Sequence, residues 1–165
     1  GFVIPSALTA QIRFIGFGDA TTGGADDDGM ISITSGITLV SGATGDAAGF
    51  VFSSLATDAN AFYMGAVKAT VVGVAVLPTE PGNLATAVVD DYTKLRVEMD
   101  SAGNVFYYGG ADTGSLNRAV EAVYQGSQAA AVTANIAYLP MFQTASTATT
   151  AVPWELDYIF GAGPP

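Results

Sequence analysis

The 165-residue chain contains no cysteine and no histidine. Without cysteine it has no disulfide, no thiolate nucleophile and no thiolate-bound metal. Without histidine it lacks the commonest general base and the commonest transition-metal ligand, so no imidazole can activate a serine. A chain of this length still buries roughly 68–70% of its extended-chain surface, so it can fold without such cross-links. We therefore expect a folded protein that is not an enzyme.

Charge is also scarce, because only 12% of the residues are charged while half are hydrophobic. Fifteen acidic residues face five scattered basic ones, for a net charge of −10. No basic stripe is present, so we expect neither nucleic acid nor an anionic membrane surface as a partner. The longest apolar run, residues 71–77, is far shorter than the ~20 residues of a membrane-spanning helix. A surface with so few charges either packs against neighbouring proteins or consists of small-residue loops.

The clearest structural signal lies in residues 94–110, KLRVEMDSAGNVFYYGG. The apolar residues Leu95, Val97 and Met99 alternate with polar ones, which predicts a strand with one face on a core. Residues 100–104 have the composition of a turn, in which Gly103 can adopt a positive φ. Residues 105–108 are β-branched and aromatic and predict the second strand of a hairpin.

Similar short segments recur along the rest of the chain. They predict strands at residues 11–17, 50–55, 61–67, 68–77, 130–139 and 154–160, with two short runs within 30–40. Pro140 is expected to end the strand at 130–139. Residues 116–124 fit a helical stripe as well as a strand, and we favour the strand because nine residues are few for an unaided helix. The strand at 11–17 is apolar on both faces, so it lies between two layers or faces a partner.

This spacing of strands predicts an all-β fold, an antiparallel β-sandwich. Residues 11–160 form the single predicted domain, residues 1–10 an N-terminal arm and residues 161–165 a flexible tail. The arm carries Phe2, Val3, Ile4 and Leu8 without a periodic pattern. We expect these four residues to contact a partner, because exposed apolar patches usually mark interaction surfaces.

Three stretches carry a resemblance to a known family. Residues 94–110, residues 137–159 (AYLPMFQTASTATTAVPWELDYI) and residues 49–67 (GFVFSSLATDANAFYMGAV) resemble strands of concanavalin A-like (laminin G-like) jelly rolls. Such domains are common in structural proteins of tailed bacteriophages. The resemblance implies a jelly roll and a capsid decoration (cement) protein on the virion surface. Its implied partners are the major capsid protein and further copies of itself, as a homotrimer.

The sugar-binding and sugar-cleaving members of this family are matched less well. Their glycosidases carry a Glu-x-Asp-x-x-Glu strand, but the second Glu is replaced by Phe160 after Glu155 and Asp157, and by Gly103 after Glu98 and Asp100. No active site is therefore carried over. The alternative function is a carbohydrate-binding module, extracellular or part of a phage host-recognition fibre, with a glycan as its partner.

Candidate binding residues each have a simpler structural interpretation. Asp26, Asp27 and Asp28 precede Gly29 and could coordinate Ca²⁺, but their spacing is not that of an EF-hand and a solvated loop is favoured. Adjacent Asp90 and Asp91 are interpreted in the same way. We expect no other cofactor. Four strand carboxylates are interpreted as partners of Lys94 and Arg96 across paired strands: Glu98, Asp100, Glu155 and Asp157. Four aromatic residues could stack on a sugar, although a core position is favoured: Tyr107, Tyr108, Trp154 and Tyr158.

Overall fold

The protein is an all-β molecule, as expected from its sequence. The computed structural model describes residues 2–3, 11–19, 31–32, 38–39, 46–53, 62–68, 71–76, 92–111, 123–146 and 155–156. All twelve elements in these ranges are β-strands. Within the same ranges there is no helix with the length and apolar character needed to cross a membrane.

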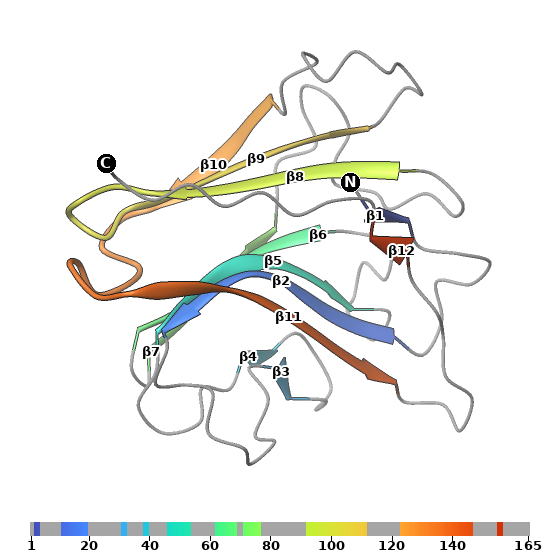
Figure 1. Ribbon diagram of the computed structural model, residues 1–165, viewed down its shortest axis with the longest axis horizontal. Coiled ribbons are helices and arrows are strands. Elements are labelled where there is room, and N and C mark those ends of the chain that lie inside the picture. The colour runs from blue at the N-terminus through green and yellow to red at the C-terminus, as the bar shows by residue number, and fades with distance from the viewer. Residues whose placement is uncertain are drawn as a thin grey trace.

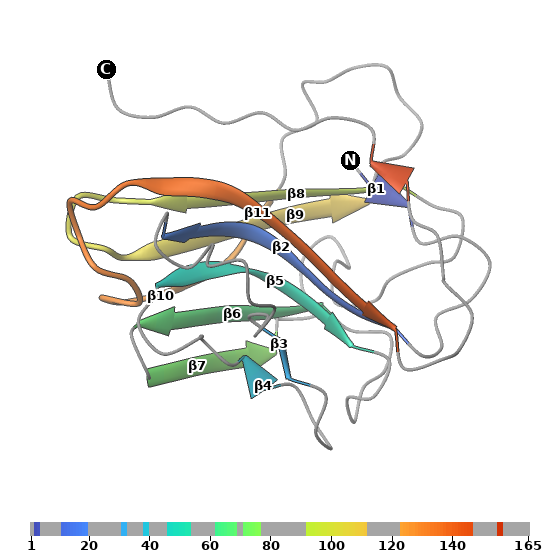
Figure 2. The ribbon, with the colours of Figure 1, turned by 60° about the horizontal axis from the view of Figure 1, so that its bottom comes forward.

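The strands form two five-stranded antiparallel sheets and one small hairpin. The first sheet has the order β10 (Val123–Gln128), β9 (Val105–Ala111), β8 (Tyr92–Met99), β1 (Phe2–Val3) and β12 (Glu155–Leu156). The second has the order β11 (Tyr138–Ser146), β2 (Gln11–Asp19), β5 (Ala47–Ser53), β6 (Phe62–Lys68) and β7 (Val71–Val76). The hairpin pairs β3 (Ile31–Ser32) with β4 (Thr38–Leu39). The two large sheets lie face to face (Figures 1 and 2), so the fold is an antiparallel β-sandwich.

The predicted central hairpin is confirmed as β8 and β9. Its register pairs Val97 with Tyr107 and Met99 with Val105. The expected alternation holds, because Val97 and Met99 are half-buried against the core while the residues between them are exposed. Gly103 has a φ of 78°, in the left-handed region that the turn requires.

Asp100 fixes the turn of this hairpin. Its Oδ1 accepts hydrogen bonds from the backbone N–H groups of Ala102 and Asn104, each at 2.9 Å. Its Oδ2 accepts a third from the Asn104 side-chain amide at 2.7 Å. The Asn104 side-chain bond is the largest of the effects that lower the pKa of Asp100. The carboxylate is therefore used to hold the turn.

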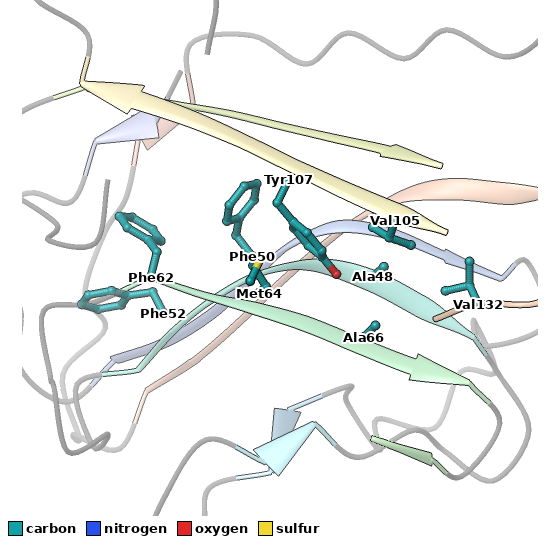
Figure 3. Close-up of a cluster of buried hydrophobic side chains, with 9 residues drawn as sticks. All are labelled: Ala48, Phe50, Phe52, Phe62, Met64, Ala66, Val105, Tyr107 and Val132. Atoms are coloured by element: carbon teal, nitrogen blue, oxygen red, sulfur yellow. The ribbon is translucent and has the colours of Figure 1, made fainter. Parts of the chain in front are cut away.

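The core fills the space between the two sheets (Figure 3). It consists of Ala48, Phe50, Phe52, Phe62, Met64, Ala66, Val105, Tyr107 and Val132. Phe50 and Tyr107 meet edge to face, with ring centroids 5.5 Å apart, and so join the second sheet to the first. The Tyr107 hydroxyl lies 2.7 Å from Gln128 Oε1 and 3.2 Å from the Gly65 carbonyl oxygen of the opposite sheet. Burial raises the pKa of this phenol, so it stays protonated and able to donate.

Strand β2 is apolar on both faces because both faces of its sheet are covered. Ile15 and Phe17 pack against the core between the large sheets. On the opposite face Phe14 is buried, in register with Val51 of β5, which pairs in turn with Tyr63 of β6. Strand β3 contacts β2, and β4 contacts β6 and β7, on the side away from the first sheet (Figure 1). Of the two expectations for this strand, a position between layers is therefore confirmed.

The prediction of a strand at residues 130–139 is wrong. Residues 129–137 form turns and irregular loop, and β11 begins only at Tyr138. Ala130 and Asn135 have φ values of 47° and 60°, which no strand can contain. Pro140 does not end the strand either: among the described strands β11 pairs only with β2, and an edge strand can turn its missing N–H away from its neighbour.

Other predicted boundaries agree only in part. Strand β10 begins at Val123, inside the stretch 116–124, while residues 112–122 lie outside the described ranges. Strand β12 covers two residues of the predicted closing strand 154–160. Phe2 and Val3, in the predicted arm, pair with both β8 and β12. At these two residues the chain is thus part of the first sheet.

Candidate functional site

An aromatic surface lies on the outer side of β8, β9 and β10. Val105 and Tyr107 face the core, so the alternating residues of β9 face outward. The register then places Arg96 of β8 and Tyr124 of β10 on either side of Tyr108. None of the described strands packs on this side of the sheet (Figure 1). We call this surface the aromatic face and define it by Arg96, Glu98, Phe106, Tyr108, Tyr124 and Ser127.

Short-range contacts organise the centre of the aromatic face. The Arg96 guanidinium carbon lies 4.1 Å from the centroid of the Tyr108 ring, a cation–π contact. Arg96 Nε also lies 3.3 Å from Glu98 Oε1. Tyr108 and Tyr124 meet at an interplanar angle of 68°, with centroids 5.7 Å apart. The Tyr124 hydroxyl is 3.1 Å from Ser127 Oγ, and 51% of Tyr124 remains exposed.

A β-bulge in β10 gives the aromatic face its shape. The register shifts between Tyr124 and Gly126, so Gln125 is an extra residue in this strand. Because of the shift, Tyr124 and Ser127 face outward together although they are three residues apart. Gln125 turns inward, where its Nε2 donates to the Gly109 carbonyl at 3.2 Å. A Cβ atom at Gly126 would lie 2.8 Å from Met64 Sδ, so this glycine lets the two sheets approach.

The electrostatics of the aromatic face suit recognition. Partial desolvation raises the pKa of the Tyr108 phenol, the Glu98 carboxylate adds to the rise, and Arg96 opposes it. Tyr108 therefore keeps its proton at neutral pH. The face offers a cation, an anion, hydroxyl groups and aromatic edges within a small area. These groups can bind a polar, partly apolar surface by stacking and hydrogen bonding.

A second polar cluster ties the loop 129–137 to the sandwich. Asp46 is buried, and its Oδ2 accepts a hydrogen bond from the Thr133 N–H and lies 3.4 Å from the Tyr138 hydroxyl oxygen. The Tyr138 hydroxyl also donates to the Thr133 carbonyl at 2.7 Å. Desolvation raises the pKa of Tyr138, and the negative charges of Asp46 and Asp19 raise it further. The Asp46 carboxylate thus has a structural use as a loop anchor.

The predicted metal ligands lie outside the described residues. These are Asp26, Asp27 and Asp28, together with the pair Asp90 and Asp91. Among the residues that the structure describes, no three acidic side chains gather closely enough to hold a metal ion. Calcium binding by the acidic loop stays a prediction.

The structure assigns the candidate strand carboxylates and aromatic residues to different places and roles. Glu98 pairs with Arg96 along its own strand instead of across strands, and Asp100 belongs to the turn. The core interpretation is right for Tyr107 but wrong for Tyr108, which belongs to the aromatic face. Four remaining candidates have side chains outside the described ranges: Trp154, Glu155, Asp157 and Tyr158.

Sequence reasoning missed Tyr124 and Phe106 as surface residues. The alternation that starts at Leu95 could have placed Phe106 and Tyr108 outward, since the hairpin register follows from its turn. Tyr124 could not be placed in this way, because its orientation depends on the bulge at Gln125.

The described part of the chain does not test the predicted contacts of the N-terminal arm with a partner. The backbones of Phe2 and Val3 lie in β1, and their side chains are outside the description. Ile4 and Leu8 lie outside the described ranges altogether. Contact of these four residues with a partner stays a prediction.

Comparison with known proteins adds no name to this site: no family model matches the chain, and neither a curated protein nor a solved structure is significantly similar to it.

Proposed function

We propose that the chain is a capsid decoration (cement) protein of a tailed bacteriophage, with a jelly-roll topology, and that it binds the major capsid protein through the aromatic face. It acts mechanically at the virion surface and not as an enzyme. The observation that carries the proposal is the group formed by the exposed Tyr124 and Arg96 and the half-buried Tyr108 between them, on the outer side of one sheet. Tyrosine and arginine are the residues most enriched at the energetic centres of protein interfaces.

The composition of the chain supports the same reading. With 12% charged residues the surface resembles that of a protein that works packed against neighbours. The resemblance of residues 94–110 to phage structural proteins points in this direction as well. Many copies bound across capsomer junctions stabilise a shell because modest individual interfaces add up. Self-association, which the resemblance also implies, belongs to this proposal.

The mutual orientation of the rings favours a protein over a sugar as the ligand. A sugar ring stacks on an open aromatic face, but one face of the Tyr108 ring is occupied by the Arg96 guanidinium. Tyr108 and Tyr124 are inclined at 68° and do not form a common plane. Inclined rings with a charge pair beside Tyr108 fit the side chains of an uneven protein surface better than a flat pyranose.

The test is co-sedimentation with capsids assembled from the major capsid protein of the same genome. We expect the wild-type chain to sediment with the capsids and Tyr124→Ala to bind roughly tenfold more weakly, since truncating a central interface tyrosine costs about 1–2 kcal/mol. Leu139→Ala is the matched control, because Leu139 is 57% exposed but lies on the other sheet. Equal weakening by both variants would refute the assignment of the aromatic face. Failure of the wild-type chain to bind would refute the decoration function.

The arm is tested separately from the aromatic face. Paired substitutions Ile4→Ser and Leu8→Ser leave β1 in place, whereas deletion of residues 1–10 removes it from between β8 and β12. Weaker capsid binding with an unchanged melting temperature would support contact of the arm with a neighbour. Unchanged binding would contradict it.

A carbohydrate-binding module is the second candidate, and the exposed ring of Tyr124 is the observation that favours it. A solvent-exposed tyrosine ring contributes to sugar binding by stacking. Under this alternative, a glycan array with and without calcium gives specific binding that Tyr124→Ala removes. Capsid binding without any glycan binding rejects it.

A further inference from the structure

Among the strands that the structure describes, four lie at the edges of the two large sheets, and β7 differs from β10 and β11. The edge strands are β10 and β12 in the first sheet and β11 and β7 in the second. An edge strand presents unpaired N–H and C=O groups that can pair with another chain, so natural proteins protect such edges. Features of the strand itself that protect an edge include very short length, bulges, prolines and charged residues.

Two of the four edge strands carry one of these features in the described part of the chain. Strand β10 contains the bulge at Gln125, and β11 contains Pro140 in its first half. Each of these features hinders regular pairing with a further strand.

Strand β7 carries none of them. Its sequence, VVGVAV, is six residues long and contains no charge, no proline and no polar side chain. Its pairing with β6 runs without a register shift from Val71 opposite Lys68 to Val76 opposite Tyr63. Strand β4 contacts β7 but belongs to a separate two-stranded sheet, and no strand that the structure describes pairs with the outer edge of β7.

We propose that the edge of β7 pairs with β7 of a second copy of this chain, joining two sandwiches through a continuous sheet. The direction of backbone groups alternates along an antiparallel strand, so three of the six residues turn their N–H and C=O groups away from β6. An antiparallel partner related by a two-fold axis can satisfy all of these groups. The axis then passes through Gly73 or Val74, depending on which set of residues faces outward.

The composition and sequence symmetry of β7 are compatible with a second copy as the occupant. Two chains with a formal charge of −10 each repel one another at most surfaces. The six residues of β7 are uncharged, so pairing them brings no carboxylates of the strand together. The alternation of β-branched and small residues at 72–76 (VGVAV) is unchanged when this stretch is reversed about Val74, so the same strand can serve on both sides. Because both copies use the same edge, the contact closes as a dimer and not as the trimer that the resemblance implies.

The absence of cysteine makes this contact directly testable. In antiparallel sheets directly opposed Cα atoms lie within the ~4.4–6.8 Å that a disulfide needs. We expect Gly73→Cys or Val74→Cys to form a covalent dimer under mild oxidation at least tenfold faster than Leu139→Cys. Leu139 is the matched control because it is exposed on the edge strand that contains Pro140. Equal rates at all three positions, with folded variants, would overturn the proposal.

A measurement on the unmodified chain covers the case in which the variants fail to fold. Amide hydrogen exchange is followed by mass spectrometry over a hundredfold range of protein concentration. We expect slower exchange in residues 71–76 as the concentration rises, with no change in residues 138–146. The mass in solution should rise from 16.7 kDa toward about twice that value over the same range. Exchange in residues 71–76 that is independent of concentration, with a constant monomer mass, would overturn the proposal.

Discussion

Replacing Tyr107 by phenylalanine removes one oxygen atom from the centre of the sandwich and leaves the packing of the ring intact. The side chain is completely buried, and its hydroxyl lies between Gln128 of β10 and the Gly65 carbonyl of β6. The substitution therefore deletes a polar link between the two sheets. It removes the single hydroxyl proton that Gln128 Oε1 and the buried Gly65 carbonyl share, and the half-buried Gln128 side chain can then turn toward water.

The expected loss follows from these contacts. A net intramolecular hydrogen bond contributes about 1 kcal/mol, and a buried acceptor left without its donor adds a further penalty. We expect Tyr107→Phe to lower the free energy of unfolding by about 1–2 kcal/mol. In a domain of this size each 1 kcal/mol corresponds to a fall in melting temperature of about 2–4 °C.

Urea unfolding with an unchanged m-value measures this loss. Tyr124→Phe is the matched control, since it deletes the same atom from an exposed tyrosine whose hydroxyl is hydrogen-bonded to Ser127. The control should change the free energy of unfolding by less than about 0.5 kcal/mol. If the two variants are equally stable, the Tyr107 hydroxyl does not link the sheets and the reasoning fails.

Three further predictions concern the hairpin turn and the loop beside it. Gly103→Ala should cost about 2 kcal/mol or more in urea unfolding, because φ is 78° and a Cβ atom would lie 2.1 Å from the Val132 carbonyl oxygen; a loss below 0.5 kcal/mol would contradict the turn. Asp100 has a pKa lowered chiefly by Asn104, so its contribution is complete above the unfolded-state value of about 3.9 and is lost as the pH falls through the folded-state value. Unfolding measured between pH 6 and pH 2 should show a shallower acid decline in Asp100→Asn than in the wild type, and parallel curves would refute this. Ala130→Gly relieves a φ of 47° and should raise the free energy of unfolding by at most about 1 kcal/mol, seen as a slightly higher melting temperature. A clear fall in melting temperature would show that the left-handed conformation of Ala130 carries no strain.

The sequence was most informative where local chemistry decides the structure. The hairpin of residues 94–110 could be predicted in detail because alternation, turn composition and a single glycine agree with one another. The strand at residues 130–139 was mispredicted because its apolar and β-branched content outweighed signals that come from elsewhere. The N–H of Ala130 donates to Asn104 Oδ1, and Thr133 donates to Asp46. These partners are distant in sequence and hold the segment in a loop.

The aromatic face was predictable only in part for a related reason. Tyr108 and Phe106 follow from the alternation of β9, but Tyr124 depends on a one-residue insertion in β10. A bulge has no distinctive sequence, and here it is dictated by packing, since Gly126 lies against Met64 of the other sheet. Likewise, residues 11–17 could not reveal which layer covers each face of β2.

The pairing of early strands with late ones has a consequence for the synthesis of the chain. Strand β2 pairs on one side with β5 but on the other with β11, and β1 lies between β8 and β12. During synthesis on the ribosome, the edge of β2 that pairs with β11 therefore has no partner until residues 138–146 have been made and have left the exit tunnel. Topologies dominated by such distant pairings fold slowly, in milliseconds to seconds. The nascent chain thus exposes an apolar strand during most of its translation, and any block in elongation before β11 leaves a product that associates with its neighbours.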